Sequence, residues 1–314
     1  MQIFKSLYGT LKATGFFSWI LITIGKRWGV DARRYYLVKL QIISQASKQL
    51  LDDIEAQAAS IPRLSAVQRL ECVNQEEFQE DYANRGKPVI LRGLVSQNQV
   101  QHWSWENLKR HHGDLMLLVR KGSDYDRMKR FRISLTDYID SMLSGEQAFY
   151  LGNNLLPKIM YDMVNIPEVL TRCNQFSHER AQLWIGGQST GAHLHRDLFD
   201  NIVFLYQGSK TFYLAAPDES QWLYIWEVHS TLNSSKFNFL APDYRRFPLA
   251  RNAHFISVTM QPGDILYIPC GWFHQVVNNH PSSSVSIFGQ RLGAAALISL
   301  NPISQPILSS LPLQ

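Results

Sequence analysis

Two histidines and one aspartate, drawn from two widely separated stretches, constrain this chain more than any other feature. His195 and Asp197 are two residues apart, and His274 lies far downstream. Side chains two apart point the same way along a β-strand, so His195 and Asp197 can bind one metal ion together. Residues 263–274 (GDILYIPCGWFH) predict a turn, a buried strand and a Pro-x-Gly turn that presents His274 at the edge of a pocket. Two imidazoles and one carboxylate are the ligand set that holds non-haem Fe(II) and leaves open positions for oxygen and a substrate.

The residues after the His-x-Asp pair form a second pattern. Asn201 follows closely, and a Gly-Ser-Lys sequence ends at Lys210. This order resembles the JmjC-like, cupin-type 2-oxoglutarate oxygenases, in particular the asparaginyl hydroxylase-type branch. The resemblance implies that His195, Asp197 and His274 bind iron. It also implies that Lys210 pairs with the distal carboxylate of 2-oxoglutarate, as a point charge on a long stem, and that Asn201 lies beside the metal.

The resemblance reaches well beyond these motifs. Residues 78–94 look like the family's entry segment, a helix followed by a strand, and residues 103–114 look like the next helix and turn. Residues 149–152 resemble the strand in which Tyr150 offers its hydroxyl to 2-oxoglutarate. The similarity covers residues 68–292 and implies an α+β fold with a mainly β core, a double-stranded β-helix of cupin or jelly-roll type with N-terminal helices.

Three features leave alternatives open. Many relatives have a hydroxyl residue where this chain has Ala192, so Thr190 and Tyr150 are the expected replacements at the co-substrate. A His193–His195 pair is a second way to choose the metal ligands, but it breaks the register with Asn201 and Lys210. A third alternative is a metal-binding cupin without turnover, which would act as a structural or sensor protein.

Charge and composition divide the chain. The net charge is +5, and residues 1–50 hold eight basic residues and one acidic residue, which leaves the remainder slightly acidic. We therefore expect a basic helical segment at 1–60, the oxygenase domain at 61–300 and a tail at 301–314. The apolar run at residues 16–24 is shorter than the roughly 20 residues that span a membrane, and it predicts a helix that packs on protein, on a second copy in a homodimer or on a membrane surface. No basic run with interleaved aromatics predicts nucleic-acid binding in the oxygenase region.

Local patterns predict the remaining elements. Apolar residues recur at helical spacing over residues 31–58, and Ser134 is placed to cap a helix. Residues 123–131 read as a polar loop, and residues 182–290 alternate short apolar strands with turns. The less regular residues 218–253 carry many aromatic side chains. Such side chains usually pack in a core, and the alternative is that they cover the mouth of the pocket.

The three cysteines are too few for a disulfide framework, which favours a reducing, cytoplasmic location. The motifs together predict a dioxygenase that uses Fe(II), 2-oxoglutarate and O2 and releases succinate and CO2. A protein or peptide side chain is the favoured substrate and a small metabolite the alternative; the absence of a reader module or zinc-finger spacing argues against chromatin demethylation. Gln290 is a further candidate beside the metal. Arg196 and Arg291 are alternative anchors for the co-substrate.

Overall fold

The computed structural model describes residues 51–121, 129–145, 149–174, 176–225 and 233–289. Residues 55–291 form one compact unit, which is the one described below. The predicted helix at residues 16–24 and the tail at 301–314 lie outside the described residues. The described part of the chain contains no helix with the length and apolar character needed to cross a membrane. The division into segments 1–60, 61–300 and 301–314 stays a prediction.

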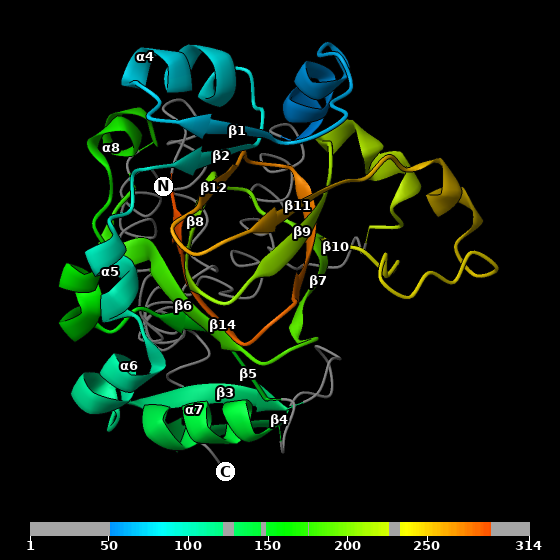
Figure 1. Ribbon diagram of the computed structural model, residues 1–314. Coiled ribbons are helices and arrows are strands. Elements are labelled where there is room, and N and C mark those ends of the chain that lie inside the picture. Colours follow the sequence, from blue (N-terminus) through cyan, green and yellow to red (C-terminus); the bar gives the residue numbers. More distant parts are fainter. Residues whose placement is uncertain (1–50, 122–128, 146–148, 175, 226–232, 290–314) are drawn as a thin grey trace, which may run out of the picture. The chain divides into compact units, whose positions relative to one another are not determined.

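Two β-sheets make up the core of this unit (Figure 1). In the described residues, one sheet has nine strands in the order β1-β2-β12-β8-β14-β6-β5-β3-β4 and the other has five in the order β10-β7-β13-β9-β11. The larger sheet contains β1 Gln68–Glu71, β2 Val89–Arg92, β3 Met116–Lys121, β4 Lys129–Ser134, β5 Phe149–Leu155, β6 Ala181–Gly186, β8 Asn201–Gln207, β12 Ile265–Ile268 and β14 Ser282–Phe288. The smaller sheet contains β7 Gly191–Arg196, β9 Lys210–Ala215, β10 Asn233–Ser234, β11 Ile256–Met260 and β13 Phe273–Asn278. The predicted jelly-roll arrangement of the α+β class is confirmed.

Helices cover the outer face of the larger sheet. They are α4 Gln75–Glu77, the π-helix η2 Phe78–Ala83, α5 Gln97–His102, α6 Trp105–His112, α7 Leu135–Ser144, η4 Lys158–Met163, α8 Glu168–Asn174 and η5 His178–Arg180. Trp103 stacks on Tyr206 of β8 with ring centroids 4.5 Å apart, and both side chains are fully buried. Burying such rings contributes about 2 to 3 kcal/mol each, so this layer fixes the sheet from outside.

Two helices predicted from local sequence signals agree with the structure. Helix α7 begins after Ser134, whose hydroxyl accepts a hydrogen bond from the Asp137 backbone at 3.1 Å. Residues 51–59 are helical, in agreement with the end of the predicted helix at 31–58. The polar loop predicted at 123–131 is wrong at its end, because residues 129–131 pair with β3 as part of β4. Isolated charge patterns do not reveal such edge pairing.

The space between the sheets has an apolar half and a polar half. The apolar half is packed with hydrophobic side chains from β2, β8 and β12 on one sheet and β9 and β11 on the other, including Ile90, Val203, Leu205, Phe212, Leu214, Val258 and Leu266. In the polar half, Ser282, Ser284 and Ser286 of β14 alternate with Val285 and Ile287, which face the outer helices. The inward serines cannot fill an apolar core, so this half of the barrel is the place for a polar ligand.

The aromatic residues between the two metal-ligand segments pack mainly as core. The helices η6 Pro217–Trp222 and η7 Pro248–Asn252 belong to this insertion. Phe237 and Phe247 are buried against Leu194 of β7 and Phe273 of β13, on the outer face of the smaller sheet. The insertion therefore supports, from behind, the two strands that carry the histidines.

Candidate metal centre

The three predicted metal ligands come together at the paired strands β7 and β13. His195 and His274 are direct partners in the antiparallel register of these strands. Asp197 follows β7 by one residue, and its backbone carbonyl accepts a hydrogen bond from the Gly271 N–H at 2.9 Å. The Pro-x-Gly turn before β13 is therefore fixed to the residue that supplies the carboxylate. The expectation that Asp197 lies within the strand needs a small correction, because β7 ends at Arg196.

The donor atoms are spaced for a single ion. His274 Nε2 lies 3.6 Å from one oxygen of Asp197, and His195 Nε2 lies 4.0 Å from the other. One ligand atom from each residue lies within 4.8 Å of the others. Donors bound to one ion at about 2.1 Å lie roughly 3 Å apart, so small side-chain rotations suffice to close the site. Within the described ranges, no other group of three histidine, cysteine or acidic side chains has this spacing.

Backbone carbonyls set the tautomer of both histidines. His195 Nδ1 lies 2.7 Å from the His193 carbonyl, and His274 Nδ1 lies 3.1 Å from the Trp272 carbonyl. A carbonyl oxygen can only accept, so each Nδ1 carries the proton and donates it. The Nε2 lone pairs are left to face Asp197, as in metal sites whose histidines are held by hydrogen bonds to the other ring nitrogen.

The electrostatics of the group also suit a cation. Burial and the neighbouring His195 hold the pKa of His274 well below its usual value, although its bond to Trp272 acts the other way. Burial raises the pKa of Asp197, while His195 lowers it. A neutral His274 is ready to bind metal. A divalent cation would supply the positive charge that the buried Asp197 carboxylate lacks.

His193 does not join this group. The backbone carbonyl of His193 orients the His195 ring, so the main chain of His193 contributes to the metal centre. The side chains of His195 and Asp197 are 15% and 11% exposed, and that of His274 is 5% exposed. The centre is therefore open on the side of His195 and closed behind His274.

Lys210 lies at the far end of the strand that pairs with β13. It is 2% exposed, and its ammonium group donates to the Ser284 hydroxyl at 2.5 Å. Burial lowers the pKa of Lys210 to about 7. Among the described side chains, no carboxylate lies within ion-pair distance of it. A buried ammonium without a counter-charge is costly, so an acidic group bound here would stabilise the charged form of Lys210.

Thr190 and Tyr150 lie together beside Gly186. A Cβ atom on Gly186 would come within 2.4 Å of Thr190 Oγ1 and of Asn278 Nδ2, and within 2.6 Å of the Tyr150 ring. Only glycine leaves this space open. The Thr190 hydroxyl donates to the Gly187 carbonyl at 2.7 Å and accepts from Asn278 at 2.9 Å. Its proton is therefore used within the protein, and its predicted contact to the co-substrate would need a partner exchange.

Two further polar groups line the same interior. Asn201 is 4% exposed, and its side-chain oxygen has no hydrogen-bond partner within the described structure. The indole N–H of Trp184 is likewise buried without a partner in those residues. The Trp184 ring lies 6.0 Å from that of Tyr150. Sequence reasoning did not identify Trp184, although its place between Leu183 and Ile185 in β6 is the alternation that indicates an inward side chain.

Arg196, between the two ligands of β7, faces the other side of the sheet. It is 5% exposed and donates to Glu55 at 2.7 Å. Its guanidinium lies 4.8 Å from the centre of the Phe273 ring, its direct cross-strand partner. The Glu55–Arg196–Phe273 group thus stands beside the His195–His274 pair. Arg196 lies on the outer face, which argues against its use as the co-substrate anchor; Gln290 and Arg291 lie outside the described residues.

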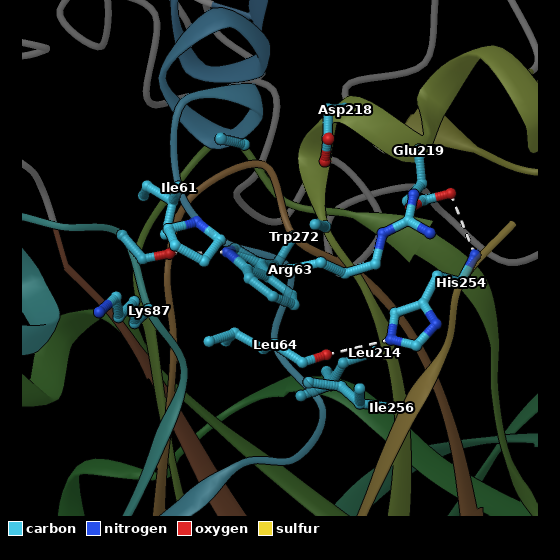
Figure 2. Close-up of a pocket in the computed structure, with 14 residues that line it drawn as sticks. Ile61, Arg63, Leu64, Lys87, Leu214, Asp218, Glu219, His254, Ile256 and Trp272 are labelled. Carbon is cyan, nitrogen blue, oxygen red and sulfur yellow. Dashed lines mark hydrogen bonds and ion pairs between the residues drawn. The ribbon is translucent and has the colours of Figure 1, made fainter.

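A separate cleft lies at the edge formed by β9 and β11 (Figure 2). Leu214, Ile256 and Trp272 line it, together with the Arg63–Glu219 ion pair of 2.9 Å. None of the predicted site residues lines this cleft. The chemistry-bearing residues lie in the polar half of the barrel instead.

A jelly roll that presents two histidines and a carboxylate from neighbouring strands belongs to the cupin class. Residues 75–290 match the family model described as cupin-like domain, and the chain belongs to that family. It is 27% identical over 243 residues to Jumonji C domain-containing protein 5 of Drosophila melanogaster, covering 71% of this chain and 59% of that protein. It is 27% identical over 235 residues to lysine-specific demethylase 8 of Danio rerio, with coverage of 71% and 58%.

A shorter match reaches a higher identity. The chain is 38% identical over 108 residues to HSPB1-associated protein 1 of Homo sapiens, which covers 33% of this chain and 22% of that protein. All three matches span less than two thirds of the relative's own length. The resemblance to JmjC-like cupins is confirmed at the level of the family.

Substitution of single histidines should distinguish the ligand set His195, Asp197 and His274 from the alternative that uses His193. We expect His195→Ala or His274→Ala to abolish stoichiometric Fe(II) binding, because two remaining donors cannot hold the ion against water. We expect His193→Ala to keep it, because only the backbone of that residue serves the site. Anaerobic equilibrium dialysis measures both, and stoichiometric binding by a His195→Ala/His274→Ala double variant would contradict the assignment.

Glu55 should support the metal from a distance. Glu55→Gln weakens a largely buried ion pair, and we expect about tenfold weaker metal binding, as for residues that orient metal ligands. The Co(II) visible spectrum should shift as well, because the ligand geometry relaxes. Lys109→Gln, which breaks the equally short but more exposed ion pair with Asp140 at 2.7 Å, is the matched control and should leave both the metal affinity and the Co(II) spectrum unchanged. Equal effects of the two variants would mean that Glu55 acts only on stability.

Proposed function

We propose that this protein is an Fe(II)- and 2-oxoglutarate-dependent oxygenase that hydroxylates a C–H bond of a protein or peptide side chain. The observation that carries the proposal is the presence, in one barrel, of a two-histidine, one-aspartate group and a buried lysine with no carboxylate partner among the described residues. The two histidines and the aspartate fit a divalent cation that keeps open coordination positions. The buried lysine fits the distal carboxylate of a dicarboxylate ligand.

The metal ligands have simple roles in this proposal. Nε2 of His195, Nε2 of His274 and the Asp197 carboxylate would hold the iron. When bound, iron and 2-oxoglutarate supply the oxidising chemistry, in which O2 is consumed, succinate and CO2 are released and one oxygen atom enters the substrate C–H bond. The protein fixes the donors, and the apolar packing behind His274 keeps water from that side.

The strand register gives the length of the co-substrate site. His274 pairs with Leu214 of β9, and Lys210 lies four residues farther along that strand, about 13 Å away. The lysine stem covers part of this distance, and a five-carbon dicarboxylate fits the remainder. In this proposal, Lys210 would hold the distal carboxylate of 2-oxoglutarate, and the metal held by His195, Asp197 and His274 would take its other end.

The remaining polar groups complete this site. Tyr150 and Thr190 flank the space beside Gly186, and we assign them to the co-substrate together with Lys210. The side-chain oxygen of Asn201, which has no partner in the described structure, would accept a hydrogen bond from a ligand or water in the interior. Of these four residues, Asn201 is the one whose side-chain oxygen has no hydrogen-bond partner in the described structure.

The relatives support a protein substrate. One of them is named a lysine-specific demethylase, and others are named for their JmjC domain. Removal of an N-methyl group also begins with hydroxylation of a C–H bond, so the same site serves both reactions. A small-molecule hydroxylase is the alternative within the enzyme class, and a metal-binding protein without turnover is the alternative outside it. A mass increase of one oxygen atom on a peptide indicates hydroxylation, whereas formaldehyde release indicates demethylation.

Turnover without a substrate tests the enzyme class. We expect the Fe(II)-loaded protein to release succinate slowly from 2-oxoglutarate in air, and His274→Ala to release none. The measurement is succinate by NMR, with the protein held anaerobic as the blank. Stoichiometric Fe(II) and 2-oxoglutarate binding without any succinate release would favour the non-catalytic alternative.

Binding of 2-oxoglutarate should be linked to protonation of Lys210. The pKa of Lys210 is lowered to about 7, so the free protein loses this charge as the pH rises above 7, and the dianion restores it. We therefore expect proton uptake on binding above this pKa and weaker affinity as the pH rises. Calorimetry of the Mn(II)-loaded protein in buffers of different ionisation enthalpy measures the proton uptake.

Two variants control for this linkage. Lys210→Arg keeps its charge throughout and should bind without proton uptake. Lys210→Ala should bind about ten- to a hundredfold more weakly, because a charge-assisted contact is lost, with metal binding unchanged. Unaltered affinity for 2-oxoglutarate in Lys210→Ala would show that the anchor lies elsewhere.

A further inference from the structure

The insertion between the two metal-ligand segments presents a basic surface. Residues 236–251 contain four basic residues and one acidic residue, a formal charge of +3, in a chain that is slightly acidic beyond residue 50. Lys236, Arg245, Arg246 and Arg251 are all exposed. Within the described residues, no carboxylate lies within 4 Å of the three arginines. The three guanidinium groups are therefore available to a partner; we call residues 236–251 the arginine surface.

Aromatic packing holds two of these arginines, Arg246 and Arg251, in place. The Arg251 guanidinium lies 4.5 Å from the centre of the Tyr244 ring, and that of Arg246 lies 5.2 Å from the Phe247 ring. Tyr244 and Phe247 both contact the buried Phe237, at 5.7 and 6.3 Å between ring centroids. Guanidinium groups stacked on a packed aromatic cluster lose little entropy when they bind.

Two leucines add an apolar component. Leu240 is 44% exposed and Leu249 is 47% exposed, and both belong to the arginine surface. The backbone there is fixed, since the Leu249 N–H donates to the Tyr224 hydroxyl at 3.0 Å and the Phe239 N–H to Gln275 of β13 at 2.9 Å. Half-exposed leucines beside rigid arginines form a preorganised surface of mixed character.

The arginine surface is attached directly to the metal-binding strands. β10, at the start of this part of the insertion, pairs with β7 so that Ser234 lies opposite His195. Phe237 and Phe247 pack on Leu194 and Phe273, the neighbours of the two histidine ligands. Figure 1 shows this segment as the yellow and gold chain that leaves the edge of the smaller sheet at β10. A partner bound here is held on the same sheet as the candidate metal centre.

We propose that the arginine surface binds a segment of the protein substrate that carries both acidic and apolar side chains. This inference rests on the proposed function and adds the substrate class. Arginine clusters recognise carboxylates through paired, charge-assisted hydrogen bonds, and the leucines receive apolar side chains of the same segment. A nucleic acid fits less well, because the rings of Tyr244 and Phe247 are already covered by arginines and Leu240 and Leu249 offer nothing to a base.

Direct binding of a simple probe tests the docking. The probe is a fluorescein-labelled peptide of alternating Glu-Asp-Leu triplets, and fluorescence anisotropy follows its binding to the full chain without metal or co-substrate. We expect saturable binding that weakens as salt is raised, because exposed charges are screened. A peptide with Gln and Asn in place of Glu and Asp should bind at least about tenfold more weakly. No binding, or equal binding of the neutral peptide, would overturn the proposal.

Charge reversal locates the site. Arg245→Glu/Arg251→Glu should weaken binding of the acidic peptide by at least about tenfold. The matched control is Arg110→Glu/Arg132→Glu, which reverses two exposed arginines elsewhere in the unit and should keep wild-type affinity. The single variant Arg245→Glu keeps the stacking of Arg251 on Tyr244. It therefore replaces the double variant in the binding assay if the double variant has a lowered melting temperature. Equal loss in the control pair would show a general charge effect and would overturn the docking site.

Other partners are outcomes of the same assay. Tighter binding of a single-stranded RNA oligonucleotide or of phosphatidylserine vesicles than of the acidic peptide, lost in Arg245→Glu, would overturn the assignment to a protein segment. Uncoupled succinate release should be the same in the wild type and in Arg245→Glu. Because peptide binding needs neither iron nor 2-oxoglutarate, absence of turnover would contradict the proposed function alone, and absence of peptide binding would contradict the docking alone.

Discussion

The antiparallel pairing of β7 with β13 is the constraint on which the candidate metal centre depends. It places His195 opposite His274, although the two residues are 79 positions apart in the sequence. The same pairing sets Arg196 opposite Phe273 on the other face, so packing and metal binding use alternate residues of two strands. A shift of one residue between the two strands would place the two histidines on opposite faces of the sheet. The buried aromatic insertion and the Glu55 ion pair therefore stabilise one register, and that register creates the site.

Sequence alone predicted the parts of this site that depend on local signals. The period-two spacing of His195 and Asp197, and the turn residues before His274, need only a strand and a hairpin-like return. The resemblance placed Lys210 in the barrel, and the structure shows it buried there. Ser134 was recognised as a helix cap for the same reason, because capping involves residues close in sequence.

The remaining parts depend on contacts that no local pattern encodes. The pairing of Glu55 with Arg196 joins residues 141 positions apart, and a single acidic residue in a helix gives no sign of its partner. Trp184 lies beside Tyr150 because β6 pairs with β5 in the larger sheet, and no local pattern predicts that pairing. The hydroxyl of Thr190 looked available in the sequence, but the fold commits its proton to a carbonyl. Long-range pairing decides which polar groups are left for a ligand.

The charges inside the barrel explain why a metal and a dicarboxylate belong together there. Asp197 and Lys210 are of opposite sign but lie at different ends of the interior, and burial disfavours the charged form of each. Neither group relieves the other, because a direct ion pair needs contact. In the proposed function, a divalent cation compensates Asp197, and a dicarboxylate compensates both the remaining charge of that cation and Lys210. Each ligand thus lowers the electrostatic cost of binding the other, and an interior that is unfavourable when only one of them is bound becomes close to neutral when both are present.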